Sequence, residues 1–154
     1  MWKSLRSPLL CRSLVMLSTA AAAQSTNGEL TLVRSATCTF EVSAVGDWTD
    51  GAPAANVKRT KLSVRLESIN VDEGTAAIVG DYGRSDVIAR LTGGALHVIQ
   101  TFREGALYTT TVFPVGVGAH RFLAVHSRHE FMAASVPGYT SRPEQYYGAC
   151  AIEP

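Results

Sequence analysis

The residues best suited to chemistry stand together at His126-Ser127-Arg128-His129-Glu130. Two imidazoles, a guanidinium and a carboxylate within five positions could line the rim of a ligand site, because a long irregular segment follows them. Tyrosines form a second group near the C-terminus, where their apolar rings and polar tips suit a recognition surface. The candidate ligand-binding residues are therefore His126, Arg128, His129, Glu130, Tyr146 and Tyr147.

The alternative function is a metal-dependent or acid–base enzyme centred on His126, His129 and Glu130. Zinc requires three or four nitrogen, oxygen or sulfur ligands. His120 could add one, but along a strand it would stand about 20 Å from His126. We therefore expect no metal and no cofactor. The simpler interpretation pairs Arg128 with Glu130 at the surface, while His126 forms a hydrogen bond within a buried strand.

Nucleophilic catalysis finds little support in the sequence. Ser127 is adjacent to His126, but neighbours on a strand point to opposite faces and cannot form a nucleophile–base pair. The chain also has no Gly-x-Ser-x-Gly motif. We therefore expect no catalytic residue and a non-enzymatic binding module.

The N-terminus reads as a secretory signal over residues 1–23. Basic residues precede the apolar run Leu9–Leu17, and the small residues Ala20–Ala23 follow it. The apolar run is too short to span a bilayer, so we expect no membrane anchor after cleavage. The sequence thus predicts a secreted or periplasmic protein with a single β domain over residues 24–154.

Loss of this signal changes the charge of the chain. The full sequence has 14 basic and 13 acidic residues. Lys3, Arg6 and Arg12 leave with the signal, so 11 basic residues remain against 13 acidic ones, a net charge near −2. Such a scattered, mildly acidic balance lacks the basic stripe that binds phosphate backbones, and we expect no nucleic acid partner.

Two cysteines, Cys38 and Cys150, remain near opposite ends of the mature chain. In an exported domain such a pair most simply forms one disulfide, and no Cys-x-x-Cys spacing suggests a metal or redox site. A loop of about 110 residues restricts the unfolded state by roughly 4–5 kcal/mol.

Alternation of apolar and polar residues predicts strands along most of the mature chain. In Lys61–Glu67, for example, Leu62, Val64 and Leu66 share one face. Short glycine-containing turns separate the central strands, which must then be antiparallel neighbours. The predicted strands are Glu29–Arg34, Thr37–Ser43, Lys61–Glu67, Thr75–Val79, Asp86–Leu91, Ala95–Phe102, Ala106–Phe113, His120–His126 and Gly148–Ile152.

Eight or nine such strands predict an all-β antiparallel meander that forms a small barrel or a two-sheet sandwich. A Cys38–Cys150 bond would place the first and last strands side by side, which favours the barrel. Composition predicts irregular segments at Asp47–Asn56 and Phe131–Tyr147, with one helical turn near Glu130–Ala134. The large residues expected to face inward are Phe40, Leu66, Phe102, Phe113 and Phe122.

The tripeptide Gly46-Asp47-Trp48 matches the Gly-x-Trp that lipocalins carry at the start of their first strand. Together with the meander and the terminal disulfide, it makes the chain resemble lipocalin-like barrels and small periplasmic inhibitor barrels in architecture. The resemblance concerns architecture alone and assigns no individual residue. The expected partner is a small apolar ligand inside the barrel or an exported protein at its rim.

Overall fold

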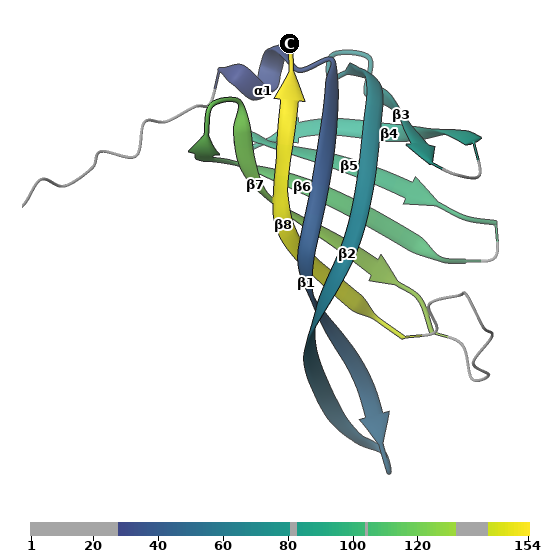
Figure 1. The fold of residues 1–154 in the computed structure, drawn as a ribbon. Coiled ribbons are helices and arrows are strands. Elements are labelled where there is room, and N and C mark those ends of the chain that lie inside the picture. The colour runs from purple at the N-terminus through teal and green to yellow at the C-terminus, as the bar shows by residue number, and fades with distance from the viewer. Residues whose placement is uncertain (1–27, 81–82, 104, 132–141) are drawn as a thin grey trace, which may run out of the picture.

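The computed structural model describes residues 28–80, 83–103, 105–131 and 142–154. A short helix, α1, is followed by eight strands in one sheet (Figure 1). Their bounds are α1 Glu29–Leu32, β1 Ser35–Thr49, β2 Ala52–Asn70, β3 Thr75–Gly80, β4 Gly83–Thr92, β5 Ala95–Thr101, β6 Leu107–Gly118, β7 Arg121–His129 and β8 Glu144–Glu153. The predicted signal over residues 1–23 lies outside the described residues. Within the described ranges, no helix has the length and apolar character needed to cross a bilayer.

Each strand pairs antiparallel with the next strand in the chain, and β8 returns to pair with β1, which closes the sheet into a barrel. Cys38 and Cys150 lie directly opposite each other in the β1–β8 pair. They form a disulfide that joins residues 112 positions apart in the sequence. The predicted antiparallel all-β fold and the predicted disulfide are both confirmed.

Large side chains fill the centre of the barrel. Phe40, Leu66 and Phe122 are at most 1% exposed, as the sequence predicted, and Phe102 is partly buried. Phe113 was predicted to face inward, but it is 37% exposed because its neighbour on β6, Val112, takes the inward position. Three further aliphatic side chains complete this centre, namely Leu96, Val98 and Val112.

The prediction of a strand over Glu29–Arg34 is wrong. Residues Glu29–Leu32 form one helical turn, α1, at the end of the barrel where the C-terminus lies (Figure 1). Leu30 and Val33 are three positions apart, which places both on one side of a helical turn, and both are fully buried in the core. A short amphipathic turn thus covers this end of the barrel, where a strand would have left one of the two side chains exposed.

The prediction of a loop over Asp47–Asn56 is also wrong, because β1 and β2 continue as a hairpin beyond the last described pair of β8 (Figure 1). We call Gly46–Asn56 the arm. The chain reverses at Asp50-Gly51, and both residues have positive φ angles, as a two-residue hairpin turn requires. Gly46-Asp47-Trp48 therefore lies late in a long strand, at the base of the arm.

The second predicted loop, Phe131–Tyr147, is shorter than expected at its C-terminal end. Strand β8 begins at Glu144, so the last four residues of the segment belong to the barrel. Glu130 and Phe131 are described without helical structure. The remainder of the predicted helical turn, and residues 132–141 as a whole, lie outside the described residues.

The ladders that close the ring differ greatly in length. Strand β2 forms thirteen residue pairs with β1 but only four with β3, and those four begin at Arg65. No described strand pairs with this second edge of β2 over Ala52–Val64. The first half of the longest strand is therefore hydrogen-bonded along one edge only.

Candidate functional site

The six predicted site residues fall into two groups on opposite sides of the barrel wall. Alternation along β7 and β8 directs His126, Arg128 and Tyr146 toward the interior, and Glu130 follows on the same side. His129 and Tyr147 are exposed, and Tyr147 is 44% exposed. The sequence cluster therefore does not form one rim, because neighbouring positions on a strand face opposite ways.

His126 is almost completely buried, with 3% of its surface exposed. The Nε of Arg128 donates a hydrogen bond to His126 Nε2 at 3.4 Å, which leaves the ring proton on Nδ1. Nδ1 lies 2.9 Å from the hydroxyl of Thr110, directly opposite on β6, and can donate to it. Burial, and then the nearby Arg128 cation, lower the pKa of His126 to about 4.

Arg128 packs between two tyrosine rings at the same end of the barrel. Its guanidinium carbon lies 5.1 Å from the ring centres of both Tyr108 and Tyr146, a distance at which cation–π attraction is effective. The two tyrosines donate their hydroxyl protons to carboxylates, Tyr108 to Glu130 at 2.9 Å and Tyr146 to Glu144. We call these residues the inner cluster: Tyr108, His126, Arg128, Glu130, Glu144 and Tyr146.

The inner cluster is poorly suited to acid–base catalysis. Its histidine has low basicity, and hydrogen-bonding groups already face both ring nitrogens. Burial, and then the hydrogen bond to Glu130, raise the pKa of Tyr108 to about 12, so this phenol stays protonated. The aromatic rings and the stacked cation instead form a packed polar layer that closes this end of the barrel.

The three downstream histidines do not converge on a metal site. His120 lies 3.3 Å from Glu29 of α1, just before the start of β7, whereas His126 lies six positions further along the chain. His129 is on the outer surface. Among the described residues, no group of three or more His, Cys, Asp or Glu side chains could hold a metal ion.

Sequence reasoning missed part of the inner cluster. Tyr108 and Thr110 lie on β6, in register with Arg128 and His126, but nothing local in their sequence marks them. The signal that could have found them is the hairpin register, since a one-to-one pairing of β6 with β7 aligns these positions. Ser43 is also fully buried, opposite Tyr146, and its hydroxyl has no hydrogen-bond partner among the described residues.

The buried histidine predicts a pH dependence of stability. His126 has a folded pKa of about 4 against 6.5 for the free side chain, so the unfolded chain takes up the proton first as pH falls. The stability that neutral, buried His126 adds to the fold is fully present above about pH 6.5 and is lost as the pH falls from about 6.5 to about 4. Urea unfolding measures the free energy of unfolding at pH 7.5 and at pH 4.5. Between these pH values it should fall by about 2–3 kcal/mol more for wild type than for His126→Gln.

His120→Gln is the matched control for this measurement, because it removes a largely exposed histidine at the other end of the barrel. We expect this variant to lose as much stability on acidification as wild type does. Equal acid sensitivity of wild type and His126→Gln would contradict the neutral, buried state of His126.

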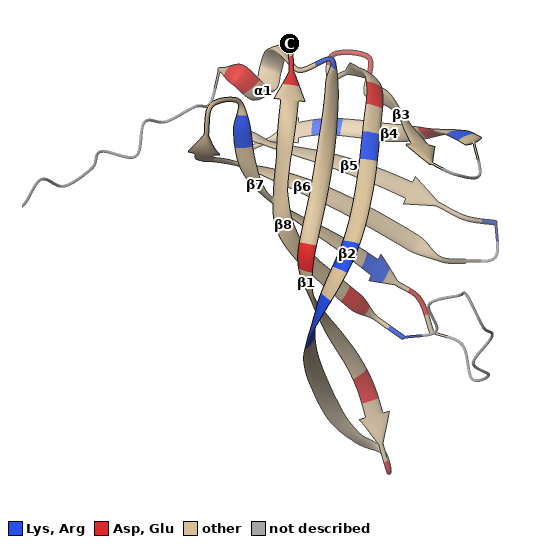
Figure 2. Cartoon of the chain, in the orientation of Figure 1, with Lys and Arg blue, Asp and Glu red and all other residues tan. Residues whose placement is uncertain are grey.

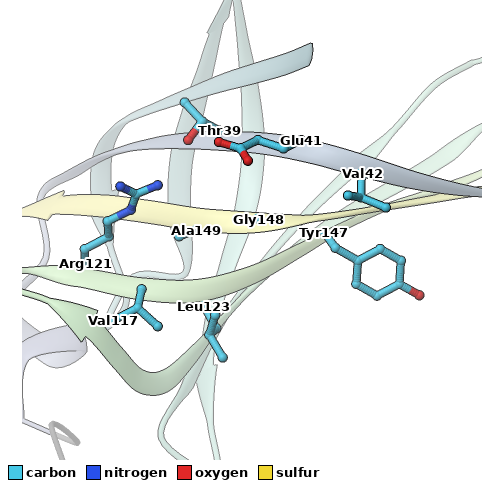
Figure 3. Close-up of a pocket in the computed structure, with 9 residues that line it drawn as sticks. All are labelled: Thr39, Glu41, Val42, Val117, Arg121, Leu123, Tyr147, Gly148 and Ala149. Carbon is cyan, nitrogen blue, oxygen red and sulfur yellow. The ribbon is translucent and has the colours of Figure 1, made fainter. Parts of the chain in front are cut away.

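The outer side of the barrel carries the other two candidates within an unusually apolar surface. Val117, Leu123 and Tyr147 are 42–48% exposed and line one open groove of about 360 Å³ with Val42 (Figure 3). Phe113 and Val115 extend the apolar surface along β6. We call this surface the outer patch: Val42, Phe113, Val115, Val117, Leu123 and Tyr147.

Two charged residues border the outer patch. Glu41 on β1 and Arg121 on β7 both line the same groove (Figure 3). The outward face of β2 is quite different, because Lys61, Ser63 and Arg65 alternate there with inward residues, and Figure 2 shows basic residues along this strand. The outward face of β2 over residues 61–65 is therefore polar, whereas the outer patch is apolar.

Aromatic residues also gather at the base of the arm. Trp48 is 54% exposed, and its ring meets that of Phe131 edge-to-face at 5.7 Å. The guanidinium of Arg142 lies 5.2 Å from the Phe131 ring centre and forms a 2.7 Å ion pair with Asp47. Trp and Arg side chains are common in the energetically important parts of protein interfaces.

The fold and these surfaces define an eight-stranded antiparallel barrel with a packed interior and an apolar outer side. Comparison with protein-family models, with curated proteins and with solved structures found no match to this chain. The proposals below therefore rest on the residues and their geometry.

Proposed function

We propose that this protein is an exported, non-enzymatic binding module that binds another exported protein through the outer patch. The observation that carries the proposal is the exposure of large apolar side chains around the groove at Leu123 and Tyr147. Contiguous apolar surfaces bordered by charged groups are typical of protein-binding sites.

The packed interior favours a protein partner over a small apolar ligand. A lipocalin-type site needs space between the inward-facing side chains. Here Phe40, Phe122 and Leu66 occupy the centre of the barrel with almost no exposed surface. The inner cluster fills the end opposite α1, where Arg128 occupies the space between two aromatic rings.

Export is supported by the N-terminal sequence and by the disulfide. Residues 1–23 have the order of basic, apolar and small residues found in secretory signals. The Cys38–Cys150 bond suits an oxidising compartment outside the cytosol. A partner exported to the same compartment follows from this location.

Site-specific photo-crosslinking tests the proposal. A benzoylphenylalanine in place of Leu123 should crosslink to a single exported protein when the purified chain is mixed with the exported fraction of its source cells. The same probe in place of Ile88, which is 46% exposed on β4, serves as the matched control and should give no such product. Unlabelled wild type should compete for the crosslink, whereas Leu123→Asp/Tyr147→Asp should compete at least about tenfold less well.

Several outcomes would overturn the proposal. The same products from both probe positions, or equal competition by the double variant, would show that the outer patch is not selective. A product of twice the chain mass would identify the patch as a contact between copies. A small molecule that co-purifies with the wild-type chain in native mass spectrometry would favour the ligand-binding alternative.

A further inference from the structure

Strand β2 offers an unpaired edge along much of its length. Between Ala52 and Val64 its second edge has no described partner strand, and Ala52–Arg59 are all exposed. Alternate residues of a strand direct their backbone N–H and C=O groups to the same edge. From Ala54 to Arg59 the strand therefore presents free donors and acceptors that match an incoming extended chain. Pro53 has no N–H, and the register shift between Arg59 and Leu62 interrupts the alternation beyond this stretch.

The unpaired edge carries concentrated positive charge. Lys58, Arg59 and Lys61 are exposed within four consecutive positions of β2, and Figure 2 shows this basic stretch where the strand leaves the barrel. Within the described chain none of the three forms an ion pair, although Glu41 lies on the adjacent strand. The edge therefore has both unsatisfied backbone groups and uncompensated cations.

This charge determines which chain could pair with the edge. Two copies of β2 that met antiparallel in a register centred near Arg59 would place Lys58, Arg59 and Lys61 of one copy near the same cations of the other, and like charges across a strand pair are destabilising. A segment with carboxylates at alternate positions would instead meet Arg59 and Lys61 on the outward face with opposite charge, while Lys58, opposite Ser43, lies on the other face. We propose that the β2 edge over Ala54–Arg59 binds an acidic, extended protein segment by strand addition.

The free edge of β2 faces away from β1, although Arg59 lies opposite Val42 of the outer patch, and its binding is tested separately from the proposed function. Binding is tested with a synthetic peptide of alternating Glu with Val or Thr, labelled with a fluorophore and titrated against the intact, oxidised protein. We expect saturable binding that weakens as salt is added. Amide hydrogen exchange should slow at alternate residues of 54–59, because the peptide occupies their hydrogen bonds.

Matched variants and peptides separate strand addition from simple charge attraction. Arg59→Glu/Lys61→Glu should weaken binding about tenfold or more. The control Arg34→Glu/Arg103→Glu makes the same change in net charge at exposed, unpaired cations elsewhere and should leave the affinity within about twofold. A peptide with alternate backbone amides methylated should bind at least about tenfold more weakly, since it cannot complete a ladder.

Three results would overturn the inference. They are equal loss of affinity in the two double variants, unchanged affinity of the methylated peptide, and unaltered exchange along β2. In any of these cases the basic residues serve only to keep the edge from pairing, as charges on edge strands commonly do. The outer patch variants should bind the peptide as wild type does, so failure of one proposal leaves the other to its own test.

Discussion

Reduction of the Cys38–Cys150 disulfide is expected to lower the free energy of unfolding by about 4–5 kcal/mol. The bond closes a loop between residues 112 positions apart, and its loss restores the conformational freedom of that loop to the unfolded chain. The folded barrel should persist after reduction, because β1 and β8 remain paired over ten residue pairs. Urea titration with and without a reducing agent measures the difference.

The double variant Cys38→Ala/Cys150→Ala is the control for the reducing agent itself. Its unfolding midpoint should match that of the reduced wild type and should not respond to reductant. A difference of less than about 1 kcal/mol between oxidised and reduced wild type would contradict the chain-entropy account.

Substitution of Gly148 by alanine should lower the free energy of unfolding by about 3 kcal/mol or more. Gly148 lies opposite Phe40, where a bulge in β1 shifts the register of the β1–β8 pair. A Cβ at this position would run into the Thr39 carbonyl oxygen and come within 2.7 Å of the Phe40 Cα. Both obstacles are backbone atoms, which cannot move without disturbing the strand pair that closes the ring.

Gly46→Ala is the matched control, because it makes the same change at a strand position with space available. The nearest atom to its added Cβ would be the Pro143 carbonyl oxygen at 3.7 Å, an ordinary contact distance. We expect its stability to stay within about 1 kcal/mol of wild type. Equal thermal and urea midpoints for Gly148→Ala and wild type would show that the bulge relaxes easily.

The strand pattern made most of the fold predictable. Alternation in Lys61–Glu67 and its counterparts identified all eight barrel strands at least in part, and the two cysteines indicated which strands close the ring. The errors arose where a strong local signal was overlooked. Asp50-Gly51 is a hairpin turn sequence, but the Pro53 that follows it made the segment look like a loop.

Less of the candidate site could be predicted, because it depends on which face each strand presents. His126, Arg128 and Tyr146 were recognised by residue type, and the structure brings them together. Their partner Tyr108 comes from another strand and is aligned only by register. The outer patch was missed for a related reason, since apolar residues such as Phe113 were assumed to face the core.

The unequal ladders around the ring also determine how the barrel moves. Thermal motion separates the weakest lateral contact most often, and the four-pair contact between β2 and β3 is far shorter than the thirteen-pair contact on the other edge of β2. The sulfur bond holds the β1–β8 contact closed during such events. The barrel should therefore open locally between β2 and β3, and β1, β2 and β8 should move together relative to the remaining strands.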